Sequence, residues 1–171
     1  MVDRRTFRVW KTICLGQYPN YQGYKACIAR AGGIRIADTA DEILRTMRCA
    51  KEKTEVDLVS IYPGRDGFNG DLGFRQPVSR SQIYEHVLAL GLELCSIEIA
   101  PALRLAYQLR GGPILIGMTP VNAGQPRTQK VLTLYNDAGP SLWLNYEHFN
   151  PPDRPVSLAT EWVFVQPRRE P

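Results

Sequence analysis

The carboxyl-terminal half of the chain holds five short stretches rich in β-branched, aromatic and leucine residues. These stretches cover residues 102–108, 113–121, 130–136, 141–147 and 161–167. Turn-forming residues separate them, among them Gly111-Gly112 and the segment 137–140. Short apolar or alternating stretches between turn signals are typical of β-strands, and sequential strands with short links favour a meander. The sequence therefore predicts a mostly antiparallel carboxyl-terminal sheet of about five strands.

The remaining segments predict helices and two further strands. Residues 7–15 and 55–63 alternate like strands, whereas residues 23–33 and about 39–50 have helical patterns. A third helix over 81–91 would begin at Ser79 or Ser81. Its inward-facing residues would be Ile83, Val87, Leu88 and Leu90. The expected fold class is α+β, with an amino-terminal helical region, one central helix and the carboxyl-terminal sheet.

A chain of 171 residues fits one domain, or a small domain with an added subdomain. Its character changes near residues 51–54, where charged residues precede a strand-like stretch. We therefore expect a basic strand and helical region over 1–54 and an α+β domain over 55–171, which could share one core.

Positive charge is concentrated in the first third of the chain. Residues 1–54 contain eleven Lys or Arg, including Arg4 and Arg5, against five acidic residues, and the remainder has a net charge of −2. Arg45, Arg48 and Lys51 are the candidate nucleic-acid-binding residues. The alternative is a solvated helix end, where positive charge complements the helix dipole. We expect only weak, salt-sensitive association with nucleic acid.

The cysteine pattern predicts reduced thiols. Cys14, Cys27, Cys49 and Cys95 form no C-x-x-C pair, and each lies in an apolar or amphipathic stretch. The basic start of the chain lacks the apolar run of a secretory signal, and no apolar run is long enough to span a membrane. The sequence therefore predicts a soluble cytoplasmic protein without membrane partners.

Common catalytic and cofactor signatures are missing from the sequence. It has no phosphate-binding G-x-x-x-x-G-K-[ST] loop, no dinucleotide-binding G-x-G-x-x-G after a strand and no G-x-S-x-G elbow. The only histidines, His86 and His148, have no metal-binding spacing. We therefore expect no metal and no cofactor.

The most chemically suggestive stretch covers residues 90–107. It places Glu93, Glu98, Arg104 and Tyr107 among apolar residues. Buried charges are costly unless paired, so an ion pair between Glu93 and Arg104 is one expectation and a ligand pocket is the other. Trp143 is a further candidate ligand-binding residue, because strand alternation places it opposite Leu142 and Leu144.

Several stretches resemble a family of uncharacterised small proteins from bacterial and metagenomic sequences. The matching stretches are WKTICLG (10–16), EVDLV (55–59), LGF (72–74), LGLELC (90–95), APALRLAY (100–107), LWL (142–144) and WVFVQP (162–167). The family pattern has a proline where this chain has Ser96, an acidic residue at Glu98 and an arginine at Arg104. The resemblance implies a setting in a mobile element or phage, but no activity and no catalytic residue.

Three functions remain open at this point. The first is a non-catalytic binding protein that holds a small ligand or a protein partner with the sheet and the 90–107 segment. The second is an enzyme acting on nucleotide or RNA, with Glu93 or Glu98 as general base and Arg104 holding phosphate. The third is a nucleic-acid-binding protein that uses the basic first third.

Overall fold

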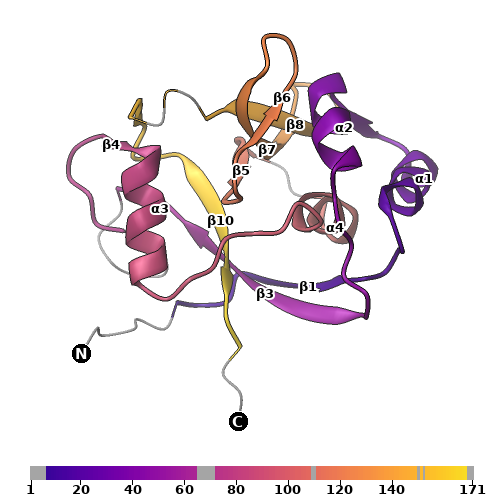
Figure 1. The fold of residues 1–171 in the computed structure, drawn as a ribbon, viewed down its shortest axis with the longest axis horizontal. Coiled ribbons are helices and arrows are strands. Elements are labelled where there is room, and N and C mark those ends of the chain that lie inside the picture. The colour runs from indigo at the N-terminus through magenta and orange to yellow at the C-terminus, as the bar shows by residue number, and fades with distance from the viewer. Residues whose placement is uncertain (1–6, 65–71, 109–110, 150, 152, 169–171) are drawn as a thin grey trace.

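A computed structural model of the chain describes residues 7–64, 72–108, 111–149, 151 and 153–168, so Arg4 and Arg5 lie outside the described residues. Four helices occur in these ranges (Figure 1): α1 (Tyr21–Ala31), α2 (Asp38–Arg45), α3 (Arg80–Ala89) and α4 (Ile99–Ala106). The strands there are β1 (Lys11–Leu15), β2 (Ile34–Ile36), β3 (Thr54–Ile61), β4 (Val78–Ser79), β5 (Ile114–Ile116), β6 (Val121–Ala123), β7 (Thr128–Asn136), β8 (Leu142–His148), β9 (Pro155–Val156) and β10 (Glu161–Gln166). The protein is therefore α+β.

The main sheet is mixed, and the predicted five-stranded antiparallel meander is wrong. Eight strands form it in the order β1-β3-β10-β5-β7-β8-β2, with β6 paired to β7. The pairs β10–β5 and β2–β8 are parallel, and the other pairs are antiparallel. In the main sheet, the stretch from β6 to β8 follows the chain order that a meander requires, whereas β5 pairs with β7 rather than with β6. The last strand instead inserts between β3 and β5.

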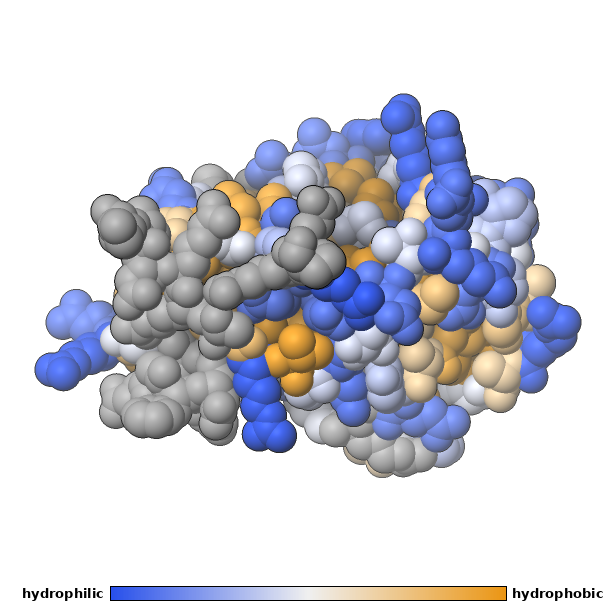
Figure 2. All heavy atoms as spheres, turned by 90° about the horizontal axis from the view of Figure 1, so that it is seen from below, coloured by the Kyte–Doolittle hydropathy of each residue, from blue (hydrophilic) through white to orange (hydrophobic). Residues whose placement is uncertain are grey.

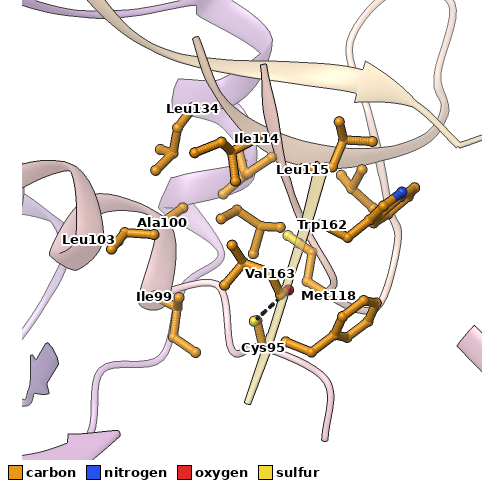
Figure 3. Packing of buried hydrophobic residues seen from close by; sticks show 14 of the residues in the cluster. Cys95, Ile99, Ala100, Leu103, Ile114, Leu115, Met118, Leu134, Trp162 and Val163 are labelled. Carbon is orange, nitrogen blue, oxygen red and sulfur yellow. Dashed lines mark hydrogen bonds between the residues drawn. The ribbon is translucent and has the colours of Figure 1, made fainter. Parts of the chain in front are cut away.

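Strand β10 is covered on both faces. Trp162, Val163 and Phe164 are all fully buried. Trp162 and Phe164 point to the same face, where the ring of Tyr84 from α3 packs edge-on against both. Figure 3 shows residues of α4 on the other side of the strand from Trp162. A strand buried on both faces carries a continuous apolar run, which explains the sequence of β10.

Helix α4 corrects a second prediction, because its residues 102–106 fall in the stretch 102–108, which was expected to be a strand. Its residues from Ile99 to Arg104 are all buried. A short apolar run does not distinguish a buried helix from a buried strand. Pro101 is compatible with the helix because it lies in the first turn, where its missing N–H has no helical acceptor.

The predicted strand over 113–121 is two strands, β5 and β6, with a break at Gly117. A Cβ atom at Gly117 would lie 2.2 Å from the ring of Phe164. The backbone of Gly117 bonds to two segments, donating to the Val163 carbonyl and accepting from the Cys95 N–H. Close approach to an aromatic ring therefore ends β5, which sequence alternation does not reveal.

The amino-terminal third is joined to the sheet at both edges. β1 pairs with β3 across the predicted boundary, and β2 pairs with β8 at the opposite edge. One cluster of buried hydrophobic residues includes side chains from both sides of residues 51–54. Helices α1 and α4 pack against each other, so the first third lies against the rest of the molecule (Figure 1).

Helix α3 begins as the sequence predicts. The Ser79 hydroxyl accepts from the Gln82 N–H, and the Gln82 side chain accepts from the Ser79 N–H, which completes a capping box. Ile83 and Val87 are buried, but Leu88 was wrongly placed inside, because its side chain is 48% exposed. The capping box uses two backbone N–H groups at the start of this helix, those of Ser79 and Gln82.

The surface is mostly polar. Figure 2 shows hydrophilic residues over much of one face, with small apolar patches between them. Within the described ranges, no helix has the length and apolar character needed to span a bilayer. The four cysteines form no disulfide; Cys95 is buried, and its thiol donates to the Val163 carbonyl (Figure 3), while the other three are half-buried.

Candidate functional site

Glu98 is buried, with 1% of its surface exposed, and its carboxylate is fully engaged by three donors. Oε1 accepts from the Gly16 N–H at 2.8 Å and from the Tyr24 hydroxyl at 2.6 Å, and Oε2 accepts from the Ala50 N–H at 2.7 Å. Burial and this carboxylate raise the pKa of Tyr24, so the phenol stays a donor. Glu98 therefore joins three amino-terminal segments to the start of α4, which is a structural role.

Arg104 lies at the other end of α4 and is also buried. Its Nη2 donates to the backbone carbonyls of Trp143 at 3.0 Å and Tyr135 at 3.3 Å. Burial lowers the pKa of the guanidinium to about 10, so it remains charged near neutral pH. These bonds attach α4 to β7 and β8.

The predicted ion pair between Glu93 and Arg104 is wrong. Glu93 is exposed, and its backbone forms a bridge with Val165 of β10. No ion pair joins the two side chains within the described ranges. The prediction failed because α4 places its arginine under β7 and β8, whereas Glu93 precedes the helix on the surface.

The other two predicted ligand-binding residues are half-buried and have local partners. The Tyr107 hydroxyl donates to the Thr12 carbonyl, and Lys11 lies 4.3 Å from the centre of its ring. The Trp143 indole donates to Asp137 at 3.1 Å, and Arg35 lies over its ring. The structure does not bring the five predicted residues together, and none of them lines the three cavities described next.

Arg45, Arg48 and Lys51 are all exposed near the end of α2. Arg45 pairs with Asp41 at 2.6 Å, one turn earlier in the same helix. Asp41 also accepts from Tyr21 and Lys25 of α1. Part of the basic charge thus holds α1 and α2 together, and nucleic-acid binding by this surface stays a prediction.

One cavity, of about 280 Å³, lies between α1 and α4. Its walls are Gln17, Tyr18, Tyr24, Cys27, Ala31, Ala102, Leu105 and Ala106. A hydrogen bond with Cys27 raises the pKa of the Tyr18 phenol. The Tyr24 hydroxyl is already bonded to Glu98, so this cavity offers a ligand mainly apolar walls.

Two adjoining cavities form a more polar cleft where β5 and β10 begin. The larger, of about 320 Å³, is lined by Tyr62, Gly112, Pro113, Ser157, Ala159, Thr160 and Glu161. The smaller, of about 250 Å³, is lined by Arg80, Pro113, Leu115, Glu147, Arg154, Pro155, Val156, Ser157 and Thr160. Pro113, Ser157 and Thr160 border both cavities, so the two lie side by side. We call them together the Arg80 cleft.

The two-stranded sheet positions the basic end of the Arg80 cleft. In the antiparallel pair β4–β9, Ser79 lies opposite Pro155. Arg80 directly follows Ser79 as the first residue of α3, Arg154 directly precedes Pro155, and both arginines line the smaller cavity. Burial lowers the pKa of Arg80; Glu147 opposes this shift, and the positive charge of Arg154 adds to it.

Arg80 differs from Arg104 in how its donors are used. Only 5% of the residue is exposed, and its guanidinium lies over the ring of Phe149. Nη2 contacts the carboxylate of Glu147 at 3.3 Å, but the buried Nε and Nη1 have no hydrogen-bond partner in the described structure. A buried polar group without a partner costs about 1–3 kcal/mol, and more if it is charged.

The opposite end of the Arg80 cleft is acidic. Glu161, the first residue of β10, accepts from the Ser60 hydroxyl of β3 at 2.5 Å. Ser157 and Thr160 add two hydroxyls between this carboxylate and the arginines. The cleft therefore has positive charge at one end, a carboxylate at the other and neutral hydrogen-bonding groups between them.

Sequence reasoning missed every residue of the Arg80 cleft. Its walls come from five separated segments, near residues 62, 80, 113, 147 and 154–161. The one local signal was Arg154 within the PPDRP turn, an isolated charge among prolines. No spacing rule relates it to Arg80, because the pairing of β4 with β9 brings them together.

Within the described ranges, no group of three or more His, Cys, Asp or Glu side chains could hold a metal ion. The chain matches no protein-family model, no curated protein and no solved structure. The resemblance to uncharacterised bacterial proteins therefore stays a prediction, and the function has to be argued from the Arg80 cleft itself.

Proposed function

We propose that this protein binds a small polar ligand in the Arg80 cleft and does not transform it. The observation that carries the proposal is that arginine, carboxylate and hydroxyl-bearing residues line two adjoining cavities. Ligand sites are typically concave, largely preformed and supplied with a few polar groups that fix orientation. Some of the wall residues lie on regular elements, with Leu115 in β5, Glu147 in β8 and Glu161 at the start of β10.

The lining residues favour binding over turnover. Ser157 and Thr160 supply hydroxyls to the cleft, but no histidine or cysteine is among its lining residues. A serine or threonine nucleophile usually needs an adjacent base. Glu161 is bonded to Ser60 rather than to Ser157 or Thr160. We further propose that the protein works in the cytoplasm, which agrees with its four unpaired cysteines.

Native mass spectrometry of the purified protein tests this proposal. We expect the wild-type chain to carry a small molecule that is released on denaturation. Ser157→Trp should abolish its retention, because Ser157 borders both halves of the cleft and an indole would fill their junction. The matched control is Leu88→Trp, since Leu88 is already 48% exposed on α3. Equal retention by both variants would overturn the proposal.

A second measurement covers a ligand that is lost during purification. The same three proteins are heated with ribose, ribose 5-phosphate, glucose and glucose 6-phosphate, and their melting temperatures are compared. A ligand that binds only the folded state raises the melting temperature. We expect at least one compound to stabilise the wild-type and Leu88→Trp proteins but not Ser157→Trp. No copurified molecule and no stabilisation would also reject the proposal.

A further inference from the structure

The Arg80 guanidinium lacks hydrogen-bond acceptors. It carries five N–H donors, one on Nε and two on each terminal nitrogen. Nε and Nη1 are buried without a partner, so three of the five are unused. The capping box of α3 supplies no acceptor to these donors, because both of its hydrogen bonds go to backbone N–H groups, those of Ser79 and Gln82.

The charge balance around Arg80 also favours an anion. Arg80 and Arg154 border the smaller cavity together with one carboxylate, that of Glu147. The side chain of Glu147 is 47% exposed, and its single contact with Arg80 is long, at 3.3 Å. The glutamate side of this pair is thus partly in water, where solvent and salt weaken its attraction to Arg80. Two arginines that repel each other are thus opposed by one weakly held acid.

We infer that the ligand of the Arg80 cleft is a phosphate monoester, whose phosphate binds Arg80 and Arg154 and whose hydroxyl-bearing body extends towards Glu161. This inference rests on the proposed function and names the class of its ligand.

A phosphate fits better than a carboxylate because of the number of donors. A phosphate monoester carries a charge of about −1.5 to −2 at pH 7 and three strong acceptor oxygens. It can receive bonds from both guanidinium groups at once, and arginine is the usual partner for such bidentate contacts. Bound phosphate in this cavity would offset the positive charge of the two arginines that line it.

Glu147 is the competitor for the phosphate. It already occupies Nη2 of Arg80, and it lies near the end of β8 with its side chain partly in water. Phosphate binding would displace this carboxylate towards solvent. The hydroxyls of the ligand would then face Ser157, Thr160 and the carboxylate of Glu161, which accepts hydrogen bonds from hydroxyls but repels a second anion.

The test is isothermal titration calorimetry with ribose 5-phosphate, ribose, inorganic phosphate and acetate at pH 7. We expect ribose 5-phosphate to bind at least tenfold more tightly than ribose, and phosphate more tightly than acetate. Arg80→Met and Arg154→Gln should each weaken ribose 5-phosphate binding by about tenfold or more, which is the loss expected for a charge-assisted hydrogen bond. Glu147→Gln should strengthen it by removing the competing carboxylate.

Arg127→Gln is the matched control, because Arg127 is exposed and pairs with Glu42 outside the cleft. It should bind like the wild type.

Arg154→Gln keeps the test decisive if Arg80→Met does not fold, because Arg154 is exposed. Ribose that binds as tightly as ribose 5-phosphate, or arginine variants that bind like the wild type, would overturn the phosphate inference and leave the binding function intact. Acetate binding as tight as that of phosphate would likewise reject a phosphate. Failure of every probe, together with unchanged retention in Ser157→Trp, would reject both.

Discussion

Glu98 and Arg80 are both buried ionisable side chains, but they are satisfied to very different degrees. The carboxylate of Glu98 receives three hydrogen bonds from three segments of the chain. The guanidinium of Arg80 has one long contact with an exposed glutamate and two nitrogens without a partner. A buried charge is retained cheaply only when it is paired or hydrogen-bonded. The comparison gives Glu98 a role in the fold, and it is the contrast on which the proposed ligand binding by Arg80 rests.

The largest effect should come from Glu98→Ala. This change leaves the N–H groups of Gly16 and Ala50 without their acceptor and removes the partner of Tyr24. We expect the free energy of unfolding to fall by about 3 kcal/mol or more, since each unsatisfied buried donor costs about 1–3 kcal/mol. Urea denaturation measures it. Glu93→Gln, at an exposed position, should stay within about 0.5 kcal/mol of wild type; equal losses in the two variants would contradict the structural role of Glu98.

A smaller loss is expected for Tyr24→Phe. The change removes one donor to Glu98 but keeps the aromatic ring and both backbone donors. The free energy of unfolding should fall by about 1.5 kcal/mol, the lower value for a hydrogen bond to a charged group. Thermal and urea unfolding of the variant provide the measurement. A larger loss than in Glu98→Ala would mean that the ring, rather than its hydroxyl, holds this region together.

Asp41 extends the comparison to a second well-bonded carboxylate. Burial acts to raise its pKa, but hydrogen bonds from Lys25, Tyr21 and Arg45 outweigh burial and lower the pKa to about 2. A folded-state pKa below the usual 3.8 adds stability above about pH 4, and that stability is lost as the pH falls towards 2. Solvent screening limits the effect to about 1 kcal/mol. Unfolding measured between pH 5 and pH 2 should show this loss in the wild type and a shallower slope in Asp41→Asn.

The smallest effect on stability should come from Arg80→Met. The change removes a poorly paired buried charge and keeps an unbranched side chain against Phe149. Replacing buried charge with apolar side chains is often neutral or stabilising, so the unfolding free energy of the unliganded protein should change by about 1 kcal/mol or less. Urea unfolding without ligand decides this. A loss as large as that of Glu98→Ala would show that Arg80 is structural and that the contrast does not hold.

Local sequence patterns predicted most elements but few of their partners. The apolar faces and turn residues located β7, β8, β10, α1 and α3, and Ser79 was one of two predicted starts of α3. The same patterns failed at α4, where burial on all sides removes the helical periodicity. They also failed at β5 and β6, where Gly117 makes room for Phe164 from a strand 47 positions further along the chain. Alternation states which residues share a face, not which strand lies beside them.

The site was less predictable than the fold. The sequence correctly singled out Glu98 and Arg104 as charges in an apolar setting, but their hydrogen-bond partners lie far away in the sequence, at Gly16, Ala50 and Trp143 among others. Those partners are mostly backbone groups, which every residue carries, so no sequence pattern marks them. A prominent charge in an apolar stretch therefore indicated burial without indicating its purpose.

The sequence by itself determined the α+β class, the ends of several helices and strands, and many of the buried side chains, although not at Leu88 or Glu93. The tertiary structure alone decided that β10 inserts between β3 and β5, and that β4 pairs with β9 and so brings Arg80 and Arg154 to one cavity. The physical reason is how far apart along the chain the interacting residues lie. Capping, alternation and turn chemistry act between residues a few positions apart, whereas strand partners and the walls of a cleft depend on how the whole chain buries its apolar surface at once.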